Sequence, residues 1–240
     1  MKIMQVANSP VFAGTGRGES SLKEAIVRLG LRKVGAIAQQ IALINSFVVP
    51  EDSGFDLQRF WEHSVGCALV ADRLVEGGFV TLAAPVRQDD YWLASLLHDI
   101  GLLVQGCFFA DWFERIVRVA NSDAVSYHRA ELDMAGSVTH ELVGELLMMK
   151  SRMPERLVVA VASHHVVGDS PAPLVALVHV ANALVKELGL AYLKDEQVDY
   201  SPAALESLGL NRTGVRAVKG VLEESVVGQV KQLVRQCMHD

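Results

Sequence analysis

The chain has 240 residues, of which 50% are hydrophobic and 21% are charged, and its formal net charge is −6. This length suffices for one domain with a full apolar core, with or without a small extension. The mildly acidic balance argues against a nucleic-acid-binding surface as the main function.

Three cysteines without a CxxC pair indicate buried thiols in a reducing compartment. The longest apolar runs, such as residues 157–162, are far shorter than the roughly 18 residues that a membrane span needs. The first ten residues lack the apolar core of a signal peptide. We therefore expect a cytoplasmic protein with neither a membrane nor a nucleic acid as its partner.

Helical signals begin in the N-terminal quarter. The segment 21–24 reads Ser-Leu-Lys-Glu and has the form of a capping box. Apolar residues then recur at helical spacing as far as Ile44. Gly30 is expected to divide this stretch into two helices.

The same signals continue to the C-terminus. Asp56 can cap a helix that runs to about Glu76, and Asp89 or Asp90 can cap the next one. Further helices are expected at about 108–119, 127–132, 138–150, 154–164, 173–188 and 216–236. No run of alternating strand residues with a hairpin turn is present, so the sequence predicts an all-α fold.

One polar, turn-like stretch, residues 190–201, interrupts the helical pattern. It predicts a boundary between a main domain of residues 1–190 and a C-terminal helical extension of residues 191–240 that packs on it.

Four apolar segments carry histidine, namely FWEHSVGCAL, ASLLHDIGLL, SVTHELVGELL and LVVAVASHH. They contain His63, His98, Asp99, His140, His164 and His165. Such groups need partners, because burying an imidazole or a carboxylate alone is costly. A shared ion would satisfy them together, and imidazole with carboxylate suits Zn, Mn, Fe or Ni.

Structural alternatives remain open for each of these groups. His63 and His98-Asp99 could form a hydrogen-bonded pair that joins two core helices. His164-His165 could interact with the dipole at a helix C-terminus. His140 could be a half-buried partner of a neighbouring carboxylate such as Glu141.

Three other side chains lie near the pattern. Cys67 follows His63 by four residues on the same helical face, as a soft ligand or as core packing. His179 precedes Asn182 by three residues and could face the pocket. His128 is expected in a polar turn without a role.

The order His, His-Asp, His, His-His resembles the HD superfamily of metal-dependent phosphohydrolases, in particular the HD-GYP branch that cleaves cyclic dinucleotides. In that superfamily a later helix supplies an aspartate ligand within a stretch resembling Val-Ala-Asp. The matching stretch here, at 180–182, ends in Asn182. The GYP loop is also absent, because the chain continues HHVVGDSPAP.

With these departures, the sequence resembles the HDOD family more than the HD-GYP branch. Its motifs are similar to residues 7–12 (Ala-Asn-Ser-Pro-Val-Phe), 25–30 (Ala-Ile-Val-Arg-Leu-Gly), 140–144 (His-Glu-Leu-Val-Gly), Pro154 and the later histidine pair. The resemblance covers about residues 1–190 and implies an HD-like bundle of many helices. HDOD domains usually begin with helices ahead of the first motif, so the N-terminal helices are expected to be missing here.

The family resemblance implies a regulatory domain of bacterial signalling that has often lost catalytic ligands. The implied metal ligands are His63, His98, Asp99, His140, His164 and His165, with Asn182 and His179 as supporting groups. A signalling protein is the expected partner, and a nucleotide or cyclic dinucleotide is a possible ligand.

Two further functions stay open. One is a metal-dependent phosphohydrolase, in which metal ions would make hydroxide available near neutral pH. Asn182 argues against it, because an amide supplies no negative charge, and no Lys or Arg stands beside either histidine doublet to bind a phosphate. The other is a helical adaptor without a metal.

Overall fold

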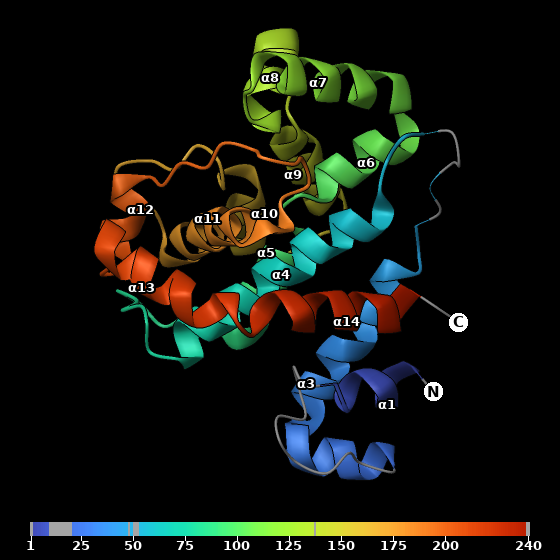
Figure 1. Cartoon of the computed structure of the whole chain (residues 1–240). Coiled ribbons are helices and arrows are strands. Elements are labelled where there is room, and N and C mark those ends of the chain that lie inside the picture. The colour runs from blue at the N-terminus through green and yellow to red at the C-terminus, as the bar shows by residue number, and fades with distance from the viewer. Residues whose placement is uncertain (1, 10–20, 48, 50–52, 137, 239–240) are drawn as a thin grey trace.

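The computed structural model describes residues 2–9, 21–47, 49, 53–136 and 138–238, and this part of the chain is helical without any strand (Figure 1). The all-α prediction is therefore confirmed. The helices are α1 (Lys2–Ala7), α3 (Leu22–Ile44), α4 (Leu57–Glu76), α5 (Gln88–Leu97), α6 (Ile100–Phe108), α7 (Ala110–Asp123), α8 (Tyr127–Ala135), α9 (His140–Lys150), α10 (Glu155–Ala162), α11 (Pro173–Val185), the π-helix η1 (Lys186–Leu190), α12 (Pro202–Ser207), α13 (Arg212–Glu223) and α14 (Val226–Met238).

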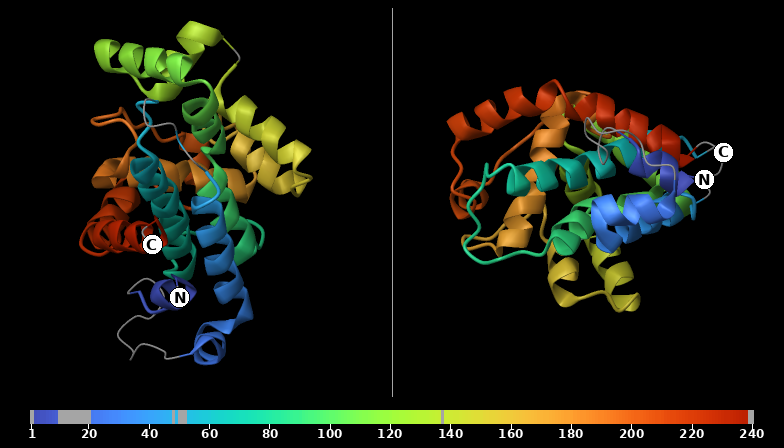
Figure 2. Two further views of the ribbon diagram at one scale, coloured as in Figure 1. Left: turned by 90° about the vertical axis from the view of Figure 1, so that its right-hand side faces the viewer. Right: turned by 90° about the horizontal axis from the view of Figure 1, so that it is seen from below.

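Helix α4 runs through the middle of the molecule, with α7 and α8 at one end and α1 and α3 at the other (Figures 1 and 2). It begins as predicted, because the Asp56 carboxylate accepts a hydrogen bond of 2.9 Å from the Arg59 backbone N–H. Every residue from His63 to Ala71 is buried. Helices α5, α11 and α14 pack around it, so its histidine faces the core.

Helix α11 is the second core helix, and all its residues from Leu174 to Val185 are buried. The stretch Pro173–Leu190 has the length and hydropathy of a membrane span, but 78% of it is buried inside the protein. A second candidate, Gln88–Phe108 with Ala110–Asp123, is bent by 116°. These helices are only weak evidence for a membrane span, because helices buried in a protein core have the same length and apolar composition. The cytoplasmic location remains a prediction.

Two glycines let α6, α9 and α10 approach closely. A Cβ atom on Gly101 would lie 1.9 Å from the carbonyl oxygen of His140, and one on Gly144 would lie 2.8 Å from Val161. Only glycine leaves room for these contacts. The Asp99 end of α6 is thereby held against the start of α9.

The N-terminal expectations are confirmed in part. The capping box forms, because the Glu24 N–H donates to Ser21 Oγ and the Ser21 N–H donates to the Glu24 carboxylate, both at 3.2 Å. The predicted break at Gly30 is wrong, since α3 is continuous; a helix tolerates an internal glycine at a cost of about 1 kcal/mol. Asn8 and Ser9 follow α1, whereas residues 10–12 of the opening motif lie outside the described residues.

Two other expected helix boundaries are wrong. Helix α5 starts at Gln88 without a side-chain cap, because the Asp90 carboxylate instead binds the Arg156 guanidinium at 2.7 and 2.8 Å. The helix expected over 216–236 is divided into α13 and α14. The division into residues 1–190 and 191–240 remains a prediction, although α14 does pack against α4.

Candidate metal centre

Five of the predicted ligands come together in the core from four parts of the chain. His63 lies on α4, His98 and Asp99 on the turn between α5 and α6, His140 at the start of α9 and His164 just after α10. All five side chains are buried. The His-Asp doublet thus lies at a break between two helices and not inside one, which lets both side chains turn toward one point.

Asp99 is the centre of this group. Its Oδ2 lies 3.4 Å from His63 Nε2 and 3.2 Å from His98 Nε2. Its Oδ1 lies 3.3 Å from His140 Nε2 and 3.2 Å from His164 Nε2. Oδ1 nevertheless accepts no hydrogen bond of acceptable geometry from the described residues. One carboxylate therefore faces two pairs of imidazoles, one pair on each oxygen.

The outward nitrogens of three of these imidazoles fix their tautomers. Each Nδ1 faces a backbone carbonyl oxygen, which can only accept a hydrogen bond. The pairs are His63 with Leu190 at 3.0 Å, His98 with Ser95 at 2.8 Å and His164 with Val161 at 2.7 Å. Because Nδ1 carries the hydrogen, the inward Nε2 of each neutral ring presents a lone pair, as a metal-binding histidine must.

His140 is oriented by a carboxylate. Glu131, on α8, is fully buried and accepts hydrogen bonds from both the His140 imidazole Nδ1 and the His140 backbone N–H, the latter at 2.8 Å. The Gln105 amide donates to the same carboxylate at 2.8 Å. A carboxylate behind a ligand histidine raises its basicity and fixes its orientation. The carboxylate suggested from the sequence, Glu141, instead pairs with His128 at 2.8 Å.

The distances between the inward-facing Nε2 atoms show whether these side chains are spaced as the ligands of a metal ion are. His63 and His98 have Nε2 atoms 3.3 Å apart, and His140 and His164 have theirs 3.4 Å apart. Two lone pairs facing each other in a buried site repel unless a cation or a proton lies between them. Ligand atoms about 2.0–2.1 Å from a tetrahedral zinc ion stand about 3.3 Å apart. The side chains therefore fit two adjacent ligand groups that share Asp99.

The electrostatics of the cluster show that its buried carboxylates favour positive charge among the histidine rings. Burial raises the pKa of Asp99, but the charge of His98 and the contacts with His140, His164 and His63 hold it well below its usual range. Burial lowers the pKa of His98, but the charges of Asp99 and Cys67 raise it to about 9. Glu131 and Asp99 likewise outweigh burial and raise the pKa of His140. Protons on these rings supply the positive charge that the buried carboxylates require.

His165 differs from the other predicted ligands. Its ring stacks on His128, with ring centroids 4.4 Å apart, and lies 4.3 Å from the His164 ring. One Asp99 oxygen and one nitrogen each of His140, His164 and His165 lie within 4.8 Å of one another. His128 was expected in a turn without a role, but it lies on α8 and covers this edge of the cluster.

A cavity of about 390 Å³ opens beside His165. Its wall includes Asn182, whose buried Oδ1 accepts no hydrogen bond from the described residues. It also includes Lys186, which was not among the predicted site residues and which pairs with Glu196 at 3.0 Å. The sequence did contain a signal for Lys186, because residues four apart in a helix lie on the same face and Lys186 follows Asn182 by four residues.

His179, the other predicted supporting group, lies behind His164. Its Nδ1 donates to the His164 carbonyl oxygen at 2.8 Å, and the Ser201 N–H donates to its Nε2 at 2.9 Å. Both ring nitrogens are therefore occupied, and His179 holds the backbone of the His164 segment.

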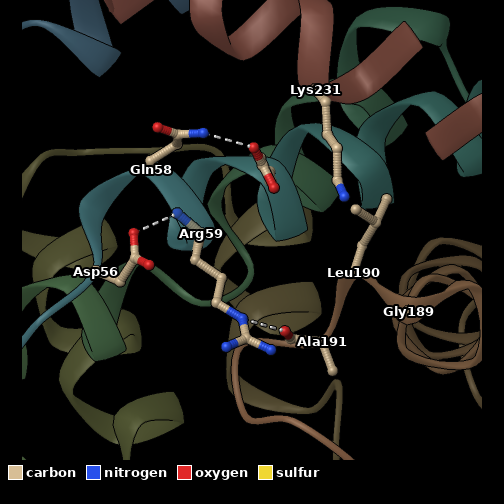
Figure 3. A pocket seen from close by; sticks show the side chains of 8 residues that line it. Asp56, Gln58, Arg59, Gly189, Leu190, Ala191 and Lys231 are labelled. Atoms are coloured by element: carbon tan, nitrogen blue, oxygen red, sulfur yellow. Dashed lines mark hydrogen bonds between the residues drawn. The ribbon is translucent and has the colours of Figure 1, made fainter. Parts of the chain in front are cut away.

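The segment that binds His63 from outside is itself attached to α4. Arg59 Nε donates to the Ala191 carbonyl oxygen at 3.0 Å, one residue after Leu190 (Figure 3). The Tyr192 hydroxyl accepts from the Asp56 backbone N–H at 2.9 Å. A cavity of about 300 Å³ lies here, with Lys231 of α14 in its wall (Figure 3). The position of His63 therefore depends on the chain around η1.

Comparison with known proteins gives one family and three structures. The HDOD domain model matches residues 1–167. The structure of an HDOD domain protein with unknown function from Geobacter sulfurreducens is 22% identical, with a TM-score of 0.79, and the match covers 99% of this chain and 81% of that one. No curated protein matches.

Two further structures are similar. A "putative phosphohydrolase" from Shewanella amazonensis SB2B is 17% identical, with a TM-score of 0.71 and coverage of 98% of this chain and 81% of that one. A "putative signal transduction protein" from Marinobacter aquaeolei VT8 is 22% identical, with a TM-score of 0.73 and coverage of 99% of this chain and 52% of that one. At these identities the likeness shows the fold.

Proposed function

Because the chain belongs to the HDOD domain family, as the match over residues 1–167 shows, we propose that it is a regulatory domain of bacterial signalling, without catalytic activity, built around a divalent metal site. The resemblance seen in the sequence is confirmed at the level of the family. In this proposal the metal is Zn, Mn, Fe or Ni, and the domain acts by binding a signalling protein or a small ligand.

The observation that carries the metal site is the convergence of four histidine Nε2 atoms on Asp99. Hydrogen bonds to backbone carbonyls and to Glu131 hold the four rings from outside, so the inward Nε2 atoms are already in position before an ion binds. Such preorganisation is expected of a ligand set and is not needed for core packing alone.

The wall of the larger cavity supports a role without catalysis. Asn182 contributes a neutral amide where the phosphohydrolase superfamily has an aspartate. Lys186 is the one formally cationic residue among the described residues of this wall, and Glu196 neutralises it. Asp199 adds a negative charge. A phosphate ester entering here would meet no uncommitted lysine or arginine.

The surface of α9 and α10 supports a protein partner. Leu146 and Met149 on α9 are each 57% exposed, and Val159 on α10 is 42% exposed. The two helices stand side by side at one edge of the molecule (Figure 2). They also position His140 and His164, so a partner bound here would lie against the elements that hold the metal ligands.

A metal-dependent phosphohydrolase is the second candidate. It is favoured by the two oxygens of Asp99, each of which faces its own pair of histidines, since such an arrangement suits the two adjacent metal ions that many hydrolases use. The cavity beside His165 would then receive a nucleotide or a cyclic dinucleotide.

Metal analysis combined with a hydrolysis screen tests the proposal. We expect the purified protein to contain metal and to hydrolyse nucleotides and cyclic dinucleotides negligibly with added Mn, Fe or Zn. His98→Ala should lower both the metal content and the melting temperature, because an ion bound only by the folded state stabilises it.

Two outcomes would change the assignment. Sustained turnover that is lost in both His98→Ala and Asp99→Ala would make the protein a phosphohydrolase. Metal-free protein whose melting temperature does not respond to added metal would leave a helical adaptor.

A further inference from the structure

Cys67 lies inside the histidine cluster although it belongs to none of the family motifs. It follows His63 by one turn of α4 and is fully buried. Its Sγ is 3.7 Å from His63 Nε2 and 4.0 Å from His98 Nε2. The Asp99 Oδ2 atom faces the same two nitrogens.

We propose that the Cys67 thiolate is a metal ligand, so that His63, Cys67, His98 and Asp99 form a mixed nitrogen, sulfur and oxygen site for a zinc-like ion. This site adjoins a second group made of His140, His164 and the other oxygen of Asp99. The inference rests on the proposed metal centre and adds to it a ligand of different chemistry.

The distances between the donor atoms fit such a site. With zinc–sulfur bonds of about 2.3 Å and zinc–nitrogen bonds of about 2.0–2.1 Å, a tetrahedral site has sulfur–nitrogen separations of about 3.6 Å and nitrogen–nitrogen separations of about 3.3 Å. The observed sulfur–nitrogen distances are 3.7 and 4.0 Å, and the nitrogen–nitrogen distance is 3.3 Å. The two distances from Asp99 Oδ2 to the nitrogens are 3.4 and 3.2 Å.

Core packing alone explains this placement less well. A thiol has a single weak hydrogen to donate, whereas two ring nitrogens, the Nε2 atoms of His63 and His98, face Cys67. Among the described residues, the other two cysteines belong to no group of potential metal ligands. Cys67 is therefore distinguished from them by its surroundings, since all three thiols are buried.

The sulfur gives the two halves of the centre different preferences. Thiolate favours softer ions such as zinc over manganese and magnesium, whereas the group around His140 and His164 offers only nitrogen and oxygen. The half that contains Cys67 should therefore retain zinc or cobalt under conditions in which it does not retain manganese.

Cobalt(II) titration of the whole protein tests the thiolate directly. Wild type should develop a sulfur-to-cobalt charge-transfer band in the near ultraviolet, and Cys107→Ser should keep it, because Cys107 lies on α6 outside the cluster. Cys67→Ser should lose the band and bind one equivalent of cobalt at least about tenfold more weakly, since even groups behind the ligands typically change affinity by 10–100-fold. His164→Ala should weaken the other equivalent and keep the band.

A measurement on unmodified protein guards against a folding defect in the variant. X-ray absorption of the zinc-loaded wild type should detect a sulfur neighbour at about 2.3 Å. Metal bound without a sulfur neighbour and without the cobalt band would overturn the role of Cys67 and leave the proposed metal centre standing. Failure to bind any divalent ion would overturn both.

Discussion

Glu131 is fully buried on α8, and its carboxylate binds both the imidazole and the backbone N–H of His140, nine residues later at the start of α9. The double contact fixes the ring and the first turn of the helix together. It also ties the imidazole of one predicted ligand to a helix that carries none of them.

Glu131→Gln should therefore weaken metal binding by about 10–100-fold without unfolding the protein, since the amide keeps the shape but not the charge. Calorimetric titration with zinc measures this. Glu141→Gln is the matched control, because Glu141 pairs with His128 and not with His140. Equal effects of the two substitutions would show that Glu131 acts only through the overall charge.

Gly101→Ala should disrupt the site through the backbone. The added Cβ would lie 1.9 Å from the His140 carbonyl oxygen, so α6 and α9 must separate. We expect a loss of at least about 2 kcal/mol in the free energy of unfolding, as for overpacking in a core. The metal content should fall with it, because the separation moves Asp99 away from His140.

Gly220→Ala is the control for this change, because nothing lies within 4 Å of a Cβ at that helical position. It should stabilise the protein by up to about 1 kcal/mol, the usual gain in a helix. Denaturant unfolding compares both variants. If Gly101→Ala were as stable as wild type, the close approach of the two helices would be unimportant.

Metal-free and metal-loaded protein should respond to pH in opposite directions. The pKa of His98 is raised from 6.5 to about 9, so protonated His98 stabilises the metal-free fold. That stabilisation is fully present below about pH 6.5 and is lost as the pH rises through about 9. A metal ion needs the deprotonated ring, so its binding strengthens over the same range.

The gap between the melting temperatures of loaded and metal-free protein should therefore widen from pH 6.5 to 9. Calorimetry at a fixed excess of zinc measures both curves. Parallel curves would mean that His98 does not exchange a proton for the ion.

Asn182→Asp should have opposite effects on folding and on metal binding. The Asn182 Oδ1 atom is buried and accepts no hydrogen bond from the described residues. A carboxylate there should destabilise the metal-free protein by at least about 1–3 kcal/mol, because a buried charge without a donor is unfavourable. The same carboxylate should bind a divalent ion more tightly than the Asn182 amide does.

Asn182→Leu separates these two effects, since it removes the polar group at nearly constant volume. It should leave the metal content unchanged. Thermal unfolding with and without zinc distinguishes the variants, and tighter zinc binding by Asn182→Leu would contradict the electrostatic explanation. Turnover need not appear in Asn182→Asp, because groups that position a substrate are also required.

Local patterns in the sequence predicted the fold and the residues that meet in the core. Asp56 and the box at Ser21 mark helix starts through hydrogen bonds within four residues, so their effect is visible in the sequence. Histidines in apolar surroundings were identified for a similar reason, since a buried imidazole needs partners. The structure places His63, His98, Asp99, His140 and His164 together, while their binding of a metal remains a prediction.

Contacts between distant helices could not be predicted in this way. Glu131 and Lys186 stand in segments whose local pattern is ordinary, and only the packing of α8 and η1 brings them to the cluster. The acceptor of the His63 hydrogen is the carbonyl of Leu190, and a backbone group leaves no trace in residue type. The break between His98 and Asp99 likewise depends on how α5 and α6 cross the core.

The Leu190 carbonyl also affects where this domain can be joined to another protein in a hybrid chain. The family match ends at residue 167, yet the acceptor for His63 and the imidazole that holds His164, His179, both lie beyond it. A hybrid protein joined at residue 167 would exchange the motifs but leave the His63 imidazole without its acceptor and the His164 backbone carbonyl without its donor, His179. A junction placed after η1 would keep the core histidines and their backbone acceptors together on one side of the junction.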